Sequence, residues 1–186
     1  MCGIAGYLGP NPLPSDRINA CLGLMARRGP DGTGSWQQET NRGQYVALLH
    51  SRLAILDLTD QAAQPYHVGK QTLVYNGELY NYHELREEFV GRHLDSSGDT
   101  AVFAQLLHDK GISALDQYEG MWAFAWFDSK SGVLTLCRDR FGEKPLYVLR
   151  TYDAIYFGSE PKFIFALLGR HLPINRRHIR RFLVNG

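Results

Sequence analysis

Short apolar runs separated by turn residues recur along this chain, and they constrain its fold more than any other feature. The clearest case is an apolar run at residues 120–128, a polar turn at 129–132 and a second run at 133–137, which together predict a β-hairpin. Further strands are predicted at residues 2–8, 45–50, 52–56, 71–75, 146–150 and 155–159. Because the strands come in hairpins, we expect antiparallel sheets.

Helices are predicted at a few points between these strands. The spacing of apolar residues predicts helices that begin near Ser15, near Asn81 and after Asp99, a fourth at residues 161–168 and a basic one at residues 175–184. Ser15 is expected to be an N-cap, and Asn81 with Glu84 is typical of a capping box. Strands that outnumber helices in this way predict an α+β fold, with helices covering antiparallel sheets.

Composition limits the classes of protein that the chain could be. Its 186 residues suffice for one domain, and 44% hydrophobic with 21% charged residues is typical of a globular protein. Lys and Arg number 20 against 19 Asp and Glu, so the net charge of +1 gives no general attraction to nucleic acid or to an anionic membrane. We interpret the arginines of residues 175–184 as a solvated or interdomain face rather than a nucleic-acid site.

The sequence contains no signal for export or for membrane insertion. No basic stretch followed by an apolar run is found near the N-terminus, and no segment approaches the length of a membrane span. The three cysteines, Cys2, Cys21 and Cys137, are not closely paired, which argues against a disulfide framework and against a metal site. These observations predict a soluble cytoplasmic protein without a bound metal.

Cys2 is the first candidate for chemistry. If Met1 is removed, Cys2 carries both a thiol and a free α-amine, and thus a nucleophile and a base on one residue. A free thiol has a pKa of about 8.5 and an α-amine one of about 7.7 to 8.0, so both groups are near their active forms at neutral pH. The alternative is an inert strand residue, since cysteine is among the most commonly buried residue types.

Three other polar features each allow a structural and a functional interpretation. The run at residues 27–32 is either a helix stop with a solvated basic pair or a loop near a charged substrate. Asn76-Gly77 is typical of a hairpin turn, and Asp99 is typical of a helix cap. None of the three features decides the question alone.

Taken together, the motifs resemble one known family. The matching stretches are Met1-Cys2-Gly3-Ile4-Ala5-Gly6, Arg28-Gly29-Pro30-Asp31-Gly32, His50-Ser51-Arg52-Leu53-Ala54-Ile55, Tyr75-Asn76-Gly77-Glu78-Leu79-Tyr80-Asn81, Ser97-Gly98-Asp99-Thr100, Glu119-Gly120-Met121-Trp122-Ala123-Phe124-Ala125, Arg138-Asp139-Arg140-Phe141-Gly142 and Lys144-Pro145-Leu146-Tyr147. In this order they resemble the class II glutamine amidotransferase domain of the asparagine synthetase family, an N-terminal-nucleophile hydrolase. The resemblance covers nearly the whole chain.

This resemblance implies a fold and a set of roles. The fold is a four-layered αββα sandwich of two mainly antiparallel sheets, which spans residues 1–186 as one glutaminase domain. Cys2 would attack the side-chain amide of L-glutamine, and the Asn76 amide with the Gly77 N–H would form the oxyanion hole. A thioester to Cys2 and its hydrolysis would release glutamate and ammonia.

Recognition of the zwitterionic head of glutamine needs one cation and one anion. Arg52 can hold the α-carboxylate through a bidentate fork, and Asp99 can pair with the α-ammonium. By resemblance, the rest of the glutamine pocket is lined by Leu53, Ile55, Leu56 and Glu78.

The chain departs from the family pattern in two ways. Arg27 stands where the family often has His, and no synthetase domain with a pyrophosphate-binding loop is found in these residues. We therefore expect no cofactor here, with ATP and Mg²⁺ required only by a synthetase domain toward which residues 170–186 lead. The partners expected are L-glutamine and that domain, with no nucleic acid and no membrane, and a homodimer is allowed. The alternatives are an amidotransferase domain that feeds a sugar or nucleotide precursor, and a non-catalytic domain of the same fold.

Overall fold

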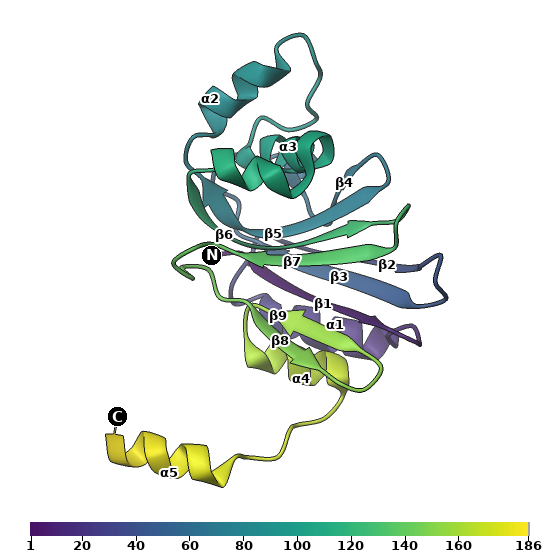
Figure 1. Cartoon of the computed structure of the whole chain (residues 1–186), viewed down its shortest axis with the longest axis vertical. Helices are drawn as coiled ribbons and strands as arrows, with labels where there is room; N and C mark the ends of the chain where they lie inside the picture. Colours follow the sequence, from purple (N-terminus) through teal and green to yellow (C-terminus); the bar gives the residue numbers. More distant parts are fainter. Residues whose placement is uncertain (186) are drawn as a thin grey trace.

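The computed structural model describes residues 1–185 and contains two antiparallel sheets that lie face to face (Figure 1). The first sheet has the strand order β2 (Gly32–Glu39), β3 (Tyr45–Arg52), β1 (Gly3–Gly9), β9 (Ile155–Gly158) and β8 (Tyr147–Arg150). The second has the order β4 (Tyr66–Val68), β5 (Gln71–Leu79), β6 (Gly120–Asp128) and β7 (Val133–Arg138). The hairpin predicted from the sequence is confirmed as β6–β7.

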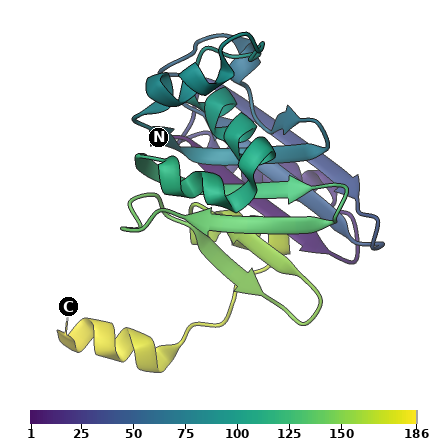
Figure 2. The ribbon, with the colours of Figure 1, turned by 45° about the horizontal axis from the view of Figure 1, so that its top comes forward.

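Helices cover the outer face of each sheet. The first sheet is covered by α1 (Ser15–Met25) and α4 (Pro161–Leu168), and the second by α3 (Asp99–Lys110), on which α2 (Tyr82–Arg86) packs in turn (Figures 1 and 2). Short 3₁₀ turns occupy Asp60–Ala62, Glu87–Phe89 and Gly111–Gln117. The predicted four-layered αββα sandwich is therefore confirmed.

The two sheets meet through one apolar interface. Successive side chains of a strand point to opposite faces, so every second residue of each central strand lies between the sheets. These inward residues are Ile4, Val46, Leu48, Val74, Ala123, Ala125, Phe127 and Phe157, all fully buried. The intervening residues pack on the helices, which explains why the central strands are apolar on both faces.

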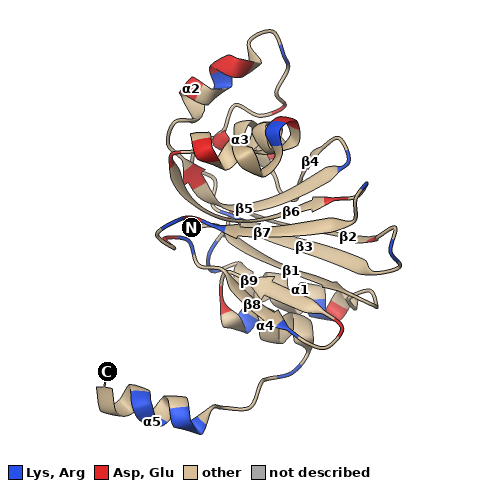
Figure 3. Ribbon diagram, viewed as in Figure 1, with Lys and Arg blue, Asp and Glu red and all other residues tan. Residues whose placement is uncertain are grey.

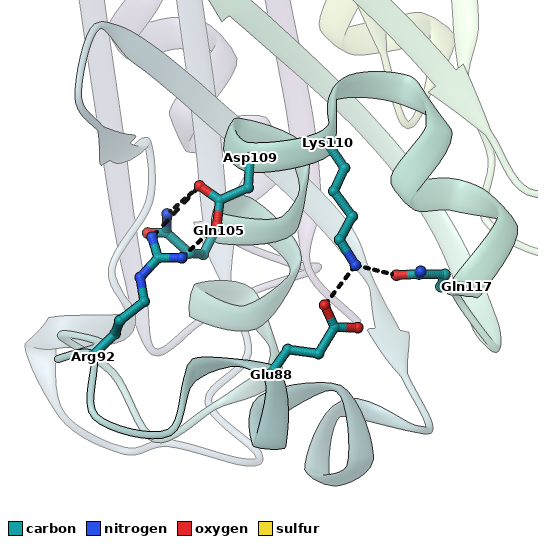
Figure 4. Close-up of polar contacts among 6 residues, drawn as sticks. All are labelled: Glu88, Arg92, Gln105, Asp109, Lys110 and Gln117. Carbon is teal, nitrogen blue, oxygen red and sulfur yellow. Dashed lines mark hydrogen bonds and ion pairs between the residues drawn. The ribbon is translucent and has the colours of Figure 1, made fainter.

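Two exposed ion pairs lie around the end of α3. Arg92 contacts Asp109 at 2.7 Å, and Lys110 contacts Glu88 at 2.5 Å and the side chain of Gln117 at 2.8 Å (Figure 4). They join the segments on both sides of the helix to its last turn. Exposed pairs of this kind contribute about 0–1 kcal/mol each, so the packing of α3 on its sheet dominates its stability.

The basic segment forms the helix α5 (Arg176–Asn185), close to the predicted bounds. It stands apart from the sandwich at the end of an extended segment, and its side chains are exposed (Figures 1 and 3). Its arginines lie between residues 176 and 181 (Figure 3), and its apolar residues Ile179, Phe182 and Leu183 are also exposed.

Two strand predictions were wrong at the places where the site lies. Residues 52–56 form no second strand, because β3 runs unbroken to Arg52 and residues 53–59 form a loop whose N–H groups bond to side chains. Asn76-Gly77 is not a turn, since β5 continues to Leu79 and pairs with β6 along its whole length. Strands β2 and β4 went unpredicted: β2 is polar at most positions, and β4 has only three residues.

The predicted caps of α1 and α3 were wrong, and the one predicted for α2 was correct in position only. Pro14 is the N-cap of α1, and Ser15 is its first residue. Asn81 is the N-cap residue of α2 but makes no capping box, because its side chain instead bonds to the backbone of Gln117 at 2.9 Å and of Glu119 at 3.1 Å. Gly98 caps α3 in place of Asp99.

Within residues 1–185, the structure has no helix with the length and apolar character that a membrane crossing requires.

Replacing an inward residue should weaken the interface between the sheets. Phe157→Ala removes a fully buried ring and should lower the free energy of unfolding by about 3–5 kcal/mol. Phe141→Ala is the control, because that ring is 88% exposed and its loss should change stability by less than about 0.5 kcal/mol. Urea unfolding followed by tryptophan fluorescence measures both. Equal losses in the two variants would contradict this account of the interface.

Candidate active site

One cavity of about 200 Å³ opens at the edge of the sandwich where the amino terminus lies between the two sheets (Figure 1). It is lined by residues from the segment just before β1, the end of β3, the 53–59 loop, the second half of β5 and the start of α3. All nine residues that the sequence predicted for the site line it: Cys2, Arg52, Leu53, Ile55, Leu56, Asn76, Gly77, Glu78 and Asp99. Predicted residues as far apart in the chain as Cys2 and Asp99 therefore line the same cavity.

Cys2 lies just before β1, at the cavity wall. The Leu53 N–H donates to its Sγ at 3.4 Å, and the Arg28 side chain donates to its carbonyl at 2.9 Å while pairing with Glu160 at 3.2 Å. Burial raises the pKa of the Cys2 thiol and the charge of Asp99 adds to the rise, while the Leu53 N–H, the amino terminus and Arg52 oppose it without cancelling it. With Met1 attached, the thiol is therefore held in place mainly in its protonated form.

Asn76 and Gly77 lie within β5, opposite Ala123 and Trp122 of β6. Asn76 is 1% exposed, and its buried Nδ2 has no hydrogen-bond partner in the described part of the chain. At Gly77 an added Cβ would lie 2.4 Å from the Met121 carbonyl oxygen, so no larger residue fits without moving the neighbouring strand. The strand thus presents an unused amide donor to the cavity.

Arg52 ends β3 and bends back onto the loop that follows it. Its Nη1 donates to the Thr59 carbonyl at 2.8 Å, and its Nη2 donates to the Asp57 carbonyl. A guanidinium has five N–H donors, so three remain for a ligand.

Asp99 is the first residue of α3 and is 7% exposed. Its Oδ2 accepts hydrogen bonds from the Tyr75 hydroxyl at 3.1 Å and from the Leu79 N–H at 3.0 Å, both on β5. Burial raises the pKa of Asp99, and these hydrogen bonds oppose the rise by favouring the carboxylate. The carboxylate therefore bonds to the strand that carries Asn76, and it does not cap its own helix.

Several cavity residues were missed by sequence reasoning. His50 is 1% exposed, and burial lowers its pKa to about 3, so its ring is neutral at physiological pH. Lys144 is 7% exposed, with its Nζ 3.6 Å from the Met1 sulfur. Tyr75 and Asp57 contribute the contacts described for Asp99 and Arg52. His50, Tyr75 and Lys144 belong to the motifs that carry the family resemblance. Their membership of these motifs is the signal from which they could have been predicted.

Among residues 1–185 no group of three or more His, Cys, Asp or Glu side chains is arranged to hold a metal ion.

Comparison with known proteins gives one family. The family described as a glutamine amidotransferase domain matches residues 1–186. A Methanocaldococcus jannaschii protein with the provisional name asparagine synthetase [glutamine-hydrolyzing] 2 is 35% identical over 90% of this chain and 35% of its own length. Asparagine synthetase B [glutamine-hydrolyzing] of Escherichia coli is 36% identical over 75% of this chain and 25% of its own. The chain thus spans about a third or less of these relatives.

Two solved structures share the fold. The glutamine phosphoribosylpyrophosphate amidotransferase from Bacillus subtilis, complexed with ADP and GMP, superposes with a TM-score of 0.70 at 20% identity, over 90% of this chain and 44% of that one. A structure described as the allosteric regulatory enzyme of purine biosynthesis gives a TM-score of 0.71 at 21% identity, over 90% and 43%. These two likenesses concern the fold alone. The match over all 186 residues shows that the chain belongs to the glutamine amidotransferase domain family.

Proposed function

We propose that this chain, after removal of Met1, hydrolyses L-glutamine to L-glutamate and ammonia through a thioester on Cys2. The ammonia then supplies an ATP-dependent synthetase that forms asparagine. Membership of the glutamine amidotransferase family supports the first step, and the names of the similar asparagine synthetases support the second.

The observation that carries this proposal is the unpartnered amide of Asn76 in the same cavity as the Cys2 thiol. A buried donor without a partner costs about 1–3 kcal/mol of stability, so its presence calls for an explanation. Attack of a thiolate on an amide carbonyl creates an oxyanion, and a donor already fixed in a buried site stabilises that charge in the transition state. Asn76, aided by the Gly77 N–H, fills this role.

The two charged side chains fit the two ends of the substrate. Arg52 has free N–H donors for the α-carboxylate of glutamine, and Asp99 offers a buried carboxylate to the α-ammonium. Leu53, Ile55, Leu56 and Glu78 form the remaining wall around the substrate.

The proton balance depends on the amine of Cys2. In the processed chain, the α-amine takes the thiol proton, and the thiolate forms a C–S bond to the amide carbon. The C–N bond then breaks, and the same proton leaves with ammonia. Water, deprotonated by the amine, cleaves the thioester and releases glutamate. With Met1 attached, the Cys2 nitrogen belongs to a peptide bond and cannot accept a proton.

ATP and Mg²⁺ belong, in this proposal, to the synthetase domain and not to the cavity described here. A reducing compartment such as the cytoplasm keeps the Cys2 thiol free for catalysis.

Removal of the Cys2 sulfur should abolish glutamine hydrolysis. In the processed protein, Cys2→Ala should reduce glutamate and ammonia release to less than about one thousandth of the wild-type rate, because no other group can form the thioester. The control is Cys137→Ala, since Cys137 lies on β7 and does not line the cavity. Intact mass confirms that Met1 is absent. A Cys2→Ala variant with unchanged release would refute the thioester.

Removal of Met1 should lower the pKa of the Cys2 thiol. In the chain that retains Met1, burial raises that pKa, so alkylation by iodoacetamide should be slow at pH 7 and increase at alkaline pH. In the processed chain a positive α-ammonium lies on Cys2 itself and favours the thiolate, which shifts the midpoint of the rate profile to lower pH. Alkylation rates of the two forms between pH 5 and about pH 10 test this. The idea fails if the two midpoints coincide.

Recognition and chemistry should be separable by mutation. Asp99→Asn removes the partner of the α-ammonium in both ground and transition states, so it should mainly raise KM for glutamine. Asn76→Ala removes an oxyanion donor and should lower kcat by about 100-fold to 1000-fold, with a smaller change in KM. Steady-state kinetics of glutamate release measures both parameters. A fall in kcat alone for Asp99→Asn would contradict its assigned role.

A further inference from the structure

A single buried carboxylate joins the two loops next to Arg52 and Asp99. Asp57 lies in the 53–59 loop, is 7% exposed and lines the cavity. Its Oδ1 accepts hydrogen bonds within its own loop, from the Thr59 N–H at 2.9 Å and the Thr59 hydroxyl at 2.7 Å. Its Oδ2 accepts from the segment before α3: the Ser96 hydroxyl at 2.6 Å, the Ser97 N–H at 3.0 Å and the Ser97 hydroxyl at 3.1 Å.

On one side, these bonds determine the position of Arg52. The guanidinium of Arg52 donates to the carbonyls of Asp57 and Thr59, so its orientation follows the conformation of the 53–59 loop. One of these carbonyls belongs to Asp57 itself. The other belongs to Thr59, whose N–H and hydroxyl donate to the Asp57 carboxylate. A change at Asp57 therefore reaches Arg52 through two contacts.

On the other side, the same carboxylate positions the start of α3. Ser96 donates to Asp57 and also accepts from the Gly98 N–H at 3.1 Å. A Cβ on Gly98 would lie 3.2 Å from the Asp57 Cβ, so the two loops are in close contact next to Asp99. Arg86 of α2 completes this turn by donating to the Ser96 and Gly98 carbonyls at 2.9 and 3.0 Å.

Asp57 is ionised at neutral pH. Hydrogen bonds from the Ser96 and Thr59 side chains hold the pKa of this carboxyl far below its usual range. An asparagine in its place has only one acceptor oxygen, so it can accept from the Thr59 N–H or from the Ser97 N–H but turns its NH₂ group toward the other.

We propose that Asp57 is a positioning residue that sets the separation between Arg52 and Asp99, and thereby the fit of the site to the charged head of glutamine. This inference rests on the proposed function, because it assigns the two charged groups to the substrate. It assigns Asp57 to substrate binding alone, whereas Cys2 and Asn76 act on the side-chain amide of glutamine.

The test uses Asp57→Asn in the full-length chain from which Met1 has been removed. We expect KM for glutamine to rise by about tenfold or more, with kcat reduced by less than about threefold. Iodoacetamide is small and lacks the zwitterionic head, so its rate of reaction with Cys2 should stay within about twofold of wild type. An electrophile that carries the α-ammonium and α-carboxylate of glutamine should instead react more slowly with Cys2, by about the same factor as the fall in kcat/KM.

Two further variants test the inference independently if the Asp57→Asn protein does not fold. Ser96→Ala removes one bond between the loops and should raise KM in the same direction, whereas Thr59→Val removes one bond within a loop and should have the smaller effect. Asp128→Asn is the matched control: Asp128 also bonds a turn, through the Lys130 N–H and the Ser131 hydroxyl at 2.9 Å each, but outside the cavity.

The outcomes are distinct. An active wild-type protein together with an unchanged KM in Asp57→Asn and Ser96→Ala would overturn this inference alone. So would a parallel loss of iodoacetamide reactivity and kcat, since it would show a general loosening of the site. A processed wild-type protein that hydrolyses no glutamine would overturn the proposed function, and this inference with it.

Discussion

The face-to-face packing of the two sheets determines where the cavity can form. Side chains two residues apart on a strand share a face, so the strand positions that continue the inward set beyond the apolar interface also point between the sheets. On β1 the inward set runs from Ile4 back to the position of Cys2, and on β5 it runs from Val74 to Asn76 and Glu78. On β3 and β6 it reaches His50, Arg52 and Met121. The residues at these ends of the inward sets line the cavity, which is thus the polar end of the same interface: Cys2, His50, Arg52, Asn76, Glu78 and Met121.

This relation explains how much of the fold could be predicted from the sequence. Apolar runs such as residues 120–128 are buried on both faces, so their composition alone marks them as strands, and the polar turn after them identifies the hairpin. The polar strand β2 lies at the edge of its sheet and pairs only with β3, so its sequence carries little of this signal. The nine residues predicted for the site, most of them from the family resemblance, all line one cavity in the structure.

The remaining features depend on contacts that no local pattern contains. Asn76-Gly77 has the composition of a turn, but pairing with β6 on one side keeps it extended. The 53–59 loop begins like a strand, yet its first two N–H groups are bonded by Cys2 and Asp31, which lie on two other segments. Asp99 has the position of a cap, but its carboxylate bonds to Tyr75 and Leu79. In each case a partner distant in sequence overrides the local preference, and such partners become visible only in the folded structure.

The contacts of Arg52 have a consequence for the entropy of binding. A free arginine side chain loses about 2 kcal/mol of rotamer entropy when it is fixed, and this cost normally opposes ligand binding. Here the carbonyls of Asp57 and Thr59 hold the guanidinium within the fold itself, so that cost is met during folding. In the role proposed for Arg52, the affinity for the α-carboxylate of glutamine then reflects mainly the new hydrogen bonds and the desolvation of both partners.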